Sequence, residues 1–243
     1  LQNINLNKKM KIAWDIGNGA MGAVIDMLAQ QLDNSENLII NKEVDGTFPN
    51  HHPDPTVPKN MEQLISTVKV NNCDIGLAFD GDGDRLGVID NCGKIIWADQ
   101  YMLLLTKEIC QLYNNPKIIM DVKSSKVFFD EAKKLNCDPL MYRTGHSPIK
   151  EKMKELQSPL SGEMSGHVCY GDDFYGYDDA MYVGLRLLRI ISNEEKSLNE
   201  LISVFPETVT TPEIRIDVDE VRKFNIVDEI KKRLKNIEGE VIN

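Results

Sequence analysis

The chain has 243 residues, 42% of them hydrophobic, so it is long enough for one large or two medium globular domains. Its formal net charge of −10 and its pI near 5.0 disfavour nucleic acid or an anionic membrane as a partner, because such a field repels phosphate groups. Five cysteines without a CxxC pair argue against a zinc site or a disulfide framework and favour a reducing compartment. No apolar run approaches the ~20 residues of a spanning helix, so a cytoplasmic protein is predicted.

The first hundred residues read as one α/β unit. Apolar spacing predicts strands over residues 11–16, 38–44 and 74–79 and helices over residues 23–32 and 61–70. Prolines from Pro49 to Pro58 mark a rigid loop between the second strand and the second helix. The turn signal Asn91-Cys92-Gly93 joins strands over residues 86–90 and 94–97 into a predicted β-hairpin. We expect a domain edge after this hairpin, which gives a first domain over residues 1–98.

The alternation of strands and helices restarts at Asp99. Helices are predicted over residues 101–112, 126–135, 147–155 and 179–191, strands over residues 117–121 and 139–142, and a glycine-rich stretch over residues 161–177. These elements predict a second α/β domain over residues 99–209. Residues 210–243 hold only a predicted strand (213–218) and helix (225–234), too little for a core, so we expect an incomplete C-terminal α+β segment there.

The most informative motif is the run Asp80-Gly81-Asp82-Gly83-Asp84-Arg85, which directly follows an apolar strand. Open α/β sheets bind ligands at this end of a strand. In an extended chain the three carboxylates would lie ~7 Å apart, too far to share one ion, so the chain must curl, and the glycines permit this. Curled carboxylates repel by roughly 4 kcal/mol per pair, which a divalent cation relieves. Hard oxygen donors favour Mg²⁺ or Ca²⁺, and Arg85 adds a fork suited to phosphate.

Two other interpretations of this run compete with a metal site. A solvated acidic turn, with its carboxylates pointing apart, needs no ion and stays open. An EF-hand calcium loop would need glycine at its sixth position and glutamate at its twelfth. This chain has Arg85 and Asn91 there, so the EF-hand interpretation is excluded.

Residues 17–22, Gly-Asn-Gly-Ala-Met-Gly, match the GxGxxG pattern of dinucleotide-binding proteins and lie between a predicted strand and a predicted helix. The acidic residue that would bind the ribose should follow about 20 residues later, and the candidate Glu43 comes somewhat late. A tight structural turn is therefore favoured, although the nucleotide interpretation stays open.

A second cluster of polar residues lies in the second unit. Residues 162–167, Gly-Glu-Met-Ser-Gly-His, place Glu163, Ser165 and His167 at alternate positions, a set that suits sugar hydroxyls, which donate and accept hydrogen bonds. His146 stands before a predicted helix and Lys123 follows a strand end, and both are positions where α/β proteins bind ligands. Each residue alone is a weak signal, and their joint placement strengthens the prediction.

Four motifs in order resemble those of the α-D-phosphohexomutase family, in its bacterial phosphomannomutase/phosphoglucomutase branch. They are residues 48–55 (Phe-Pro-Asn-His-His-Pro-Asp-Pro), 77–85 (Leu-Ala-Phe-Asp-Gly-Asp-Gly-Asp-Arg), 144–147 (Thr-Gly-His-Ser) and 162–167. The resemblance runs almost end to end. It implies an α/β fold of two mixed-sheet domains, like the second and third domains of the family enzymes, with the start of a fourth.

The resemblance implies a role for each residue of the acidic run. Asp80, Asp82 and Asp84 resemble the three protein ligands of an essential Mg²⁺. Arg85 resembles the residue that holds the active-site phosphate. The expected ligand is a hexose phosphate, namely the 1- or 6-phosphate of mannose or glucose.

The resemblance likewise assigns the polar residues of the second unit. Glu163, Ser165 and His167 are similar to the loop that grips the hydroxyls of the sugar ring. Lys123 and His146 match family residues that line the same cleft, with His146 near the proton transfer.

In the family, a phosphoserine in a Ser-His loop phosphorylates the sugar phosphate, and the resulting 1,6-bisphosphate returns its other phosphate to the serine. This sequence contains no serine directly followed by histidine. We expect the phosphoserine domain to precede Leu1 and the last domain's phosphate-clamping loop to follow Asn243, so the predicted function is a phosphohexomutase core that is inactive alone. The alternative is a non-catalytic module that binds Mg²⁺ and sugar phosphate or pairs with a separately encoded N-terminal domain.

Overall fold

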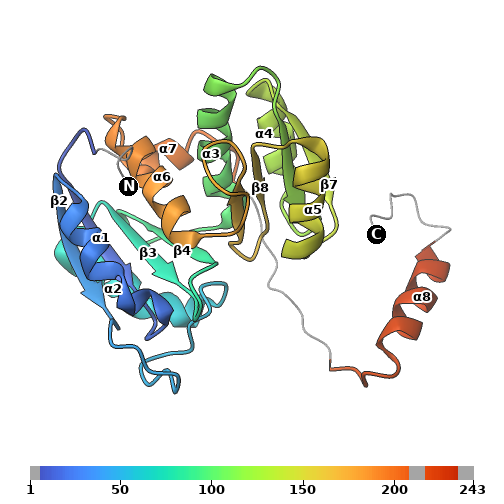
Figure 1. Ribbon diagram of the computed structural model, residues 1–243, viewed down its shortest axis with the longest axis horizontal. Helices are drawn as coiled ribbons and strands as arrows, with labels where there is room; N and C mark the ends of the chain where they lie inside the picture. Colours follow the sequence, from blue (N-terminus) through green and yellow to red (C-terminus); the bar gives the residue numbers. More distant parts are fainter. Residues whose placement is uncertain (1–5, 208–216, 235–243) are drawn as a thin grey trace. The chain divides into compact units, whose positions relative to one another are not determined.

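A computed structural model of the chain describes residues 6–207 and 217–234. The chain divides into two compact units, Leu1–Glu207 and Thr208–Asn243, and each is described by itself. Figure 1 shows two β-sheets in the first unit, with helices packed against them. The predicted fold class is confirmed, because the fold is α/β with two mixed sheets.

The first sheet has the strand order β2-β1-β3-β4-β5. In chain order its strands are β1 (Met10–Asp15), β2 (Ser35–Ile40), β3 (Ile75–Phe79), β4 (Leu86–Asp90) and β5 (Ile95–Ile96). β1 is parallel to β2 and β3, whereas β4 is antiparallel to β3 and β5. The predicted hairpin is confirmed, and its turn contains Gly93 with a φ of 81°. β3 is buried along its whole length, which places the acidic run at the end of a core strand.

The second strand begins three residues earlier than predicted. The apolar run over residues 38–44 indicated its position, but β2 pairs with β1 in a register from Met10↔Ser35 to Asp15↔Ile40. β2 is an edge strand and only partly buried, so its polar first half is tolerated. Asn41 then adopts a left-handed backbone with a φ of 53°, which ends the strand.

Both helices of the first sheet are preceded by a 3-10 turn. α1 (Ile25–Gln31) follows a turn over Ala20–Ala23, and α2 (Glu62–Asn71) follows a turn over Pro58–Met61. The amide of Val24 donates to the carbonyl of Met21 at 3.1 Å, a bond that spans three residues. The predicted start of α1 at residue 23 is therefore two residues too early.

The second sheet has the strand order β7-β6-β8-β9. β6 (Lys117–Asp121) is parallel to β7 (Asp138–Tyr142) and to β8 (Leu160–Gly162), and β9 (Val168–Tyr170) is antiparallel to β8. The sequence predicted no strand in the glycine-rich stretch over residues 161–177, but β8 begins one residue before this stretch and β9 lies inside it. Their three residues each are too few for an alternating pattern to be recognised.

The predicted helices of the second sheet are present as α3 (Ala98–Leu112), α4 (Lys126–Lys134), α5 (His146–Leu156) and α6 (Ala180–Ser192). α3 begins three residues early, because the Gln100 side chain accepts a hydrogen bond from the Trp97 amide at 2.9 Å and caps the helix there. α7 (Leu198–Ile202) is absent from the prediction, although Ser197 and Glu200 form a capping box.

In the second compact unit, α8 (Lys223–Leu234) corresponds to the helix predicted over residues 225–234. The strand predicted over residues 213–218 lies mostly outside the described residues. No described helix is both long enough and apolar enough to cross a membrane. All five cysteines are free.

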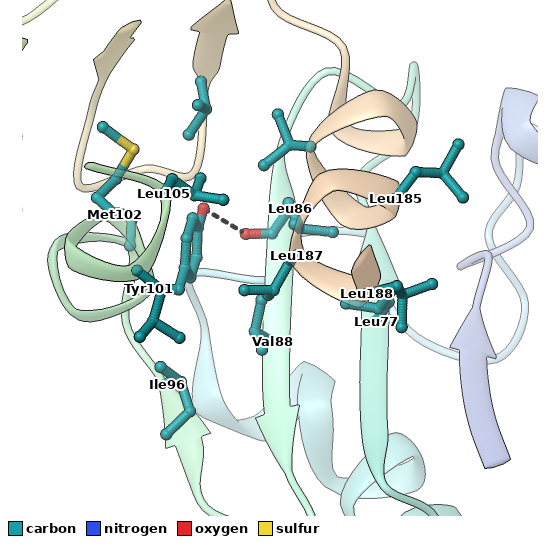
Figure 2. Close-up of a cluster of buried hydrophobic side chains, with 14 of the residues drawn as sticks. Leu77, Leu86, Val88, Ile96, Tyr101, Met102, Leu105, Leu185, Leu187 and Leu188 are labelled. Carbon is teal, nitrogen blue, oxygen red and sulfur yellow. Dashed lines mark hydrogen bonds between the residues drawn. The ribbon is translucent and has the colours of Figure 1, made fainter. Parts of the chain in front are cut away.

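The two sheets share one apolar core, to which α3 and α6 contribute (Figure 2). Leu187 of α6 is fully buried, and a Cβ at Gly184 of the same helix would lie 3.3 Å from Leu77 of β3. From α3, the Tyr101 hydroxyl donates a hydrogen bond to the carbonyl of Leu86 in β4 at 3.2 Å. The boundary predicted at residue 98 coincides with the start of α3, and residues on both sides of it fill the same core.

A buried ion pair joins α3 to α6. Arg186 is 1% exposed, and its Nε and Nη2 donate to Glu108 Oε2 at 2.9 and 2.6 Å. Its Nη1 donates to the Tyr182 hydroxyl at 2.9 Å, and the guanidinium lies 4.3 Å from the ring centroid of Tyr170. A buried charge is tolerated only when it is paired, so this network fixes α6 against α3.

We expect Leu187→Ala to lower the free energy of unfolding by about 2–5 kcal/mol, because it leaves a cavity in the shared core. Urea denaturation followed by circular dichroism measures the change. The matched control Leu112→Ala removes the same atoms from a side chain that is 63% exposed, and it should change the free energy by less than about 0.5 kcal/mol. Equal losses in the two variants would contradict the placement of α6 in the core.

Candidate functional site

The acidic run curls at the end of β3, as the spacing of its carboxylates requires. The Asp80 side chain is buried, and its Oδ1 accepts hydrogen bonds from the amides of Gly83, Asp84 and Arg85 at 3.0, 3.0 and 3.1 Å. Gly83 has a φ of 83°, a conformation that favours glycine. Residues 80–85 are called the acidic loop below.

The glycine motif of residues 17–22 packs against this loop. The amide of Ala20 donates to the carbonyl of Gly81 at 2.9 Å. A Cβ at Gly19 would lie 2.7 Å from the same carbonyl oxygen, and a Cβ at Gly22 would lie 2.1 Å from the carbonyl oxygen of Lys42. The protein's own backbone therefore explains these two glycines, which supports the structural turn over the nucleotide site.

The three aspartates of the acidic loop form a group that could hold a metal ion. Asp80, Asp82 and Asp84 each offer one oxygen, and these oxygens lie within 4.8 Å of one another. Burial and the neighbouring Asp80 charge raise the pKa of Asp84 to about 6. Burial also opposes ionisation of Asp80, but hydrogen bonds from Arg85 outweigh it and lower the pKa of Asp80. Hard oxygen donors that crowd negative charge fit Mg²⁺ or Ca²⁺.

Arg85 is held by two carboxylates and stays partly exposed. Its Nε donates to Asp80 Oδ2 at 2.6 Å, and its Nη1 lies 3.4 Å from Asp54 Oδ1. The side chain is 27% exposed, which leaves donors for an anion. Asp54 belongs to the proline-rich loop, 31 positions before Arg85, and no pattern in the sequence predicts this contact.

Three polar side chains gather in the loop between β8 and β9, called the Glu-Met-Ser loop (residues 163–167). Glu163 Oε1 accepts a hydrogen bond from the Gly145 amide at 2.6 Å, and its Oε2 lies 3.0 Å from His167 Nδ1. Ser165 Oγ lies 2.8 Å from the same nitrogen. Burial disfavours the charged form of His167, but Glu163 and Asp84 outweigh it and raise the pKa of this histidine.

The acidic loop and the Glu-Met-Ser loop touch, although they belong to different sheets. The Leu86 amide donates to the Gly166 carbonyl at 3.1 Å, and His167 Nε2 lies 3.3 Å from Asp84 Oδ1. Gly166 has a φ of 97°, and a Cβ there would lie 2.7 Å from the Leu86 carbonyl oxygen. The residues predicted for metal and for sugar thus lie side by side.

His146 contacts the Glu-Met-Ser loop, whereas Lys123 does not. The His146 ring stacks on the His167 ring with centroids 5.6 Å apart, and its Nδ1 lies 3.6 Å from Asp178 Oδ2. Asp178 accepts a hydrogen bond from Lys150 at 2.9 Å, and no motif in the sequence predicts it as a neighbour of His146. Lys123 is exposed after β6, and within the described part of the chain no hydrogen bond or ion pair joins it to the other candidates.

Solved structures place this fold among the phosphohexomutases. A phosphoglucomutase/phosphomannomutase family protein from Burkholderia thailandensis matches with a TM-score of 0.89 and 36% identity, over 99% of this chain and 51% of that one. The N-acetylphosphoglucosamine mutase of Aspergillus fumigatus, in complex with GlcNAc-6P and magnesium, has the same fold. Its TM-score is 0.68 at 12% identity, over 85% of this chain and 50% of that one.

Sequence comparison narrows the class. Family models for phosphoglucomutase/phosphomannomutase alpha/beta/alpha domains II and III match residues 2–93 and 97–208. The phosphomannomutase/phosphoglucomutase of Pseudomonas putida is 44% identical over 230 residues, which are 95% of this chain and 50% of that protein. The chain therefore belongs to the phosphoglucomutase/phosphomannomutase family. It spans about half the length of the curated relatives it matches.

We expect the Asp84 carboxyl group to titrate at about 6 in metal-free protein, since burial and Asp80 both disfavour its ionised form. In Asp80→Asn the pKa of Asp84 should fall, because the neighbouring charge is lost while the amide oxygen can still accept the backbone hydrogen bonds. Carbon-13 NMR of labelled aspartate measures both values. An ordinary aspartate pKa for Asp84 in the wild type would contradict the crowding of carboxylates in the acidic loop. An unchanged pKa of Asp84 in Asp80→Asn would show that burial alone causes its shift.

Proposed function

We propose that this chain forms the metal- and sugar-binding core of a phosphoglucomutase/phosphomannomutase, an isomerase that interconverts hexose 1-phosphates and 6-phosphates. One observation carries the proposal: the acidic loop and the Glu-Met-Ser loop meet, with His167 Nε2 3.3 Å from Asp84 Oδ1. Carboxylates suited to a cation and groups suited to hydroxyls therefore lie within reach of one small ligand. A sugar phosphate combines these two needs.

The acidic loop serves the phosphate end of this ligand. Asp80, Asp82 and Asp84 would hold Mg²⁺, which neutralises charge on the transferring phosphoryl group when it is bound. Arg85 donates hydrogen bonds to phosphate oxygens from a direction that its two carboxylate partners fix. The magnesium and GlcNAc-6P in the A. fumigatus enzyme support this metal and this class of ligand.

The second sheet serves the sugar. The Glu163 carboxylate accepts hydrogen bonds from ring hydroxyls, Ser165 donates and accepts, and His167 donates, so the group can orient a ring. We propose that His146, whose ring stacks on that of His167, moves a proton at the hydroxyl that receives the phosphoryl group. Lys123 is exposed at the same sheet edge and attracts the anionic substrate. Orientation of the reacting groups is the main contribution of this part.

The sequence has no serine in a Ser-His pair, the context in which the family carries its phosphoryl group. We propose that a further segment of a longer protein, or a separately encoded N-terminal domain, supplies the phosphoryl carrier.

The five free cysteines support a cytoplasmic location. Reading the DNA upstream of the Leu1 codon for an in-frame Ser-His motif separates this enzyme core from a non-catalytic module that only binds Mg²⁺ and sugar phosphate.

Mg²⁺ should bind the purified chain through the acidic loop, and calorimetric titration measures it. Asp82→Asn should abolish binding, whereas Asp33→Asn, at an exposed aspartate in the turn between α1 and β2, should not change it. Because only the ionised form of Asp84 binds a metal and its pKa is about 6, the affinity should fall as the pH drops through that value. Equal binding by wild type and Asp82→Asn would place the metal elsewhere.

The chain alone should bind glucose 1-phosphate in the presence of Mg²⁺ but should not convert it, even with a bisphosphate activator. Without a phosphoryl carrier the reaction lacks the donor of the first transfer and the acceptor of the second, and losses of this kind reach several orders of magnitude in rate. An assay coupled to glucose 6-phosphate formation measures turnover. Turnover that survives repurification and disappears in Asp80→Asn would contradict this expectation.

A further inference from the structure

Asp121 ends β6, the strand of the second sheet that is parallel to both β7 and β8. The loops after these three strands therefore leave the sheet at one edge. They carry most of the candidate residues of the second sheet. The Asp121 side chain is 0% exposed at this edge.

The carboxylate of Asp121 makes one hydrogen bond to each of the three loops. Its Oδ1 accepts from the Ser124 hydroxyl at 2.7 Å and from the Met164 amide at 3.1 Å. Its Oδ2 accepts from the Thr144 hydroxyl at 3.1 Å. Each partner stands within two residues of a candidate site residue: Ser124 beside Lys123, Thr144 two residues before His146, and Met164 between Glu163 and Ser165.

We infer that Asp121 is a positioning residue, which fixes the three loops of the second sheet relative to one another without touching the substrate itself. The role in sugar binding rests on the proposed function. Because Asp121 is buried, removal of its carboxylate leaves the Met164 amide without its acceptor and the Ser124 and Thr144 hydroxyls without a common partner. The affinity for a ligand falls steeply when the side chains that orient it are no longer held in position by their neighbours.

Two further hydrogen bonds determine how strongly each loop depends on Asp121. Asp99 Oδ2 accepts from the Ser125 amide at 3.0 Å, so the loop after β6 keeps one anchor when Asp121 is replaced. The Gly145 amide is held by Glu163, which belongs to a loop that Asp121 anchors. The loops after β7 and β8 should therefore loosen together, and the loop after β6 should loosen less.

Amide hydrogen exchange of the whole chain tests this coupling without any ligand. In Asp121→Ala, peptides over residues 143–147 and 163–167 should exchange faster, whereas β1 in the other sheet should keep its wild-type rate. Asp121→Asn keeps an acceptor oxygen for Met164 and Ser124, and its amide can donate to the Thr144 hydroxyl. The asparagine variant should therefore recover most of the protection.

Calorimetry with glucose 1-phosphate and Mg²⁺ tests the role in binding. Asp121→Ala should lower the affinity by about 10–100-fold, and Asp121→Asn should fall between it and the wild type. The matched control is Asp90→Ala, which removes a carboxylate that is also 0% exposed at a strand end and accepts hydrogen bonds from the Cys92 and Lys94 amides. This control should loosen its own hairpin and leave the affinity unchanged.

The outcomes separate this inference from the proposed function. If the wild type does not bind glucose 1-phosphate, the proposed function fails, and exchange in the two loops alone decides whether Asp121 positions them. If Asp121→Ala does not fold, Thr144→Val replaces it, because it removes one of the hydrogen bonds and should speed exchange over residues 143–147 and weaken binding. Wild-type exchange in both loops of a folded variant, or an affinity loss no larger than that of Asp90→Ala, overturns the inference.

Discussion

The candidate site depends on one hydrogen bond, which the Leu86 amide donates to the Gly166 carbonyl at 3.1 Å. It joins the first residue of β4 in one sheet to the loop between β8 and β9 in the other, so the two sheets must keep a fixed separation. The apolar core shared by α3 and α6 provides this, together with the hydrogen bond from Tyr101 to the Leu86 carbonyl. The hydrogen bonds between Arg186 and Glu108 also hold the two helices in one orientation. The geometry of the site is therefore a property of the core and not of the loops alone.

The sequence predicted the elements that carry a strong apolar pattern, and it failed where pairing or capping decides the outcome. β3 and β6 are buried over all or nearly all of their five residues, and their positions follow from their apolar runs. The register of β2 is set by its partner β1, which no local pattern reveals. β8 and β9 are too short to show alternation, and α7 depends on a capping box rather than on apolar spacing.

The candidate site shows the same division. The acidic run is predictable because its carboxylates are close in sequence and must curl to share an ion. Its meeting with the Glu-Met-Ser loop follows from the family resemblance and not from any spacing. Leu86 and Gly166 are 80 positions apart in sequence, and only the path of the fold through α3 to β8 brings them together. Asp54 and Asp178 act through residues distant in sequence, 31 and 28 positions away, so local reasoning assigns them no role.

The close approach of Gly166 to Leu86 also determines how relatives could be recombined. A hybrid that takes residues up to 98 from one family member and the remainder from another would bring together two backbones that were shaped separately. At this contact even one added carbon would lie 2.7 Å from a carbonyl oxygen, and close-packed interiors absorb such a mismatch poorly. We therefore expect a hybrid to preserve this contact best when the acidic loop and the Glu-Met-Ser loop come from the same parent, although the chain places them on separate sheets.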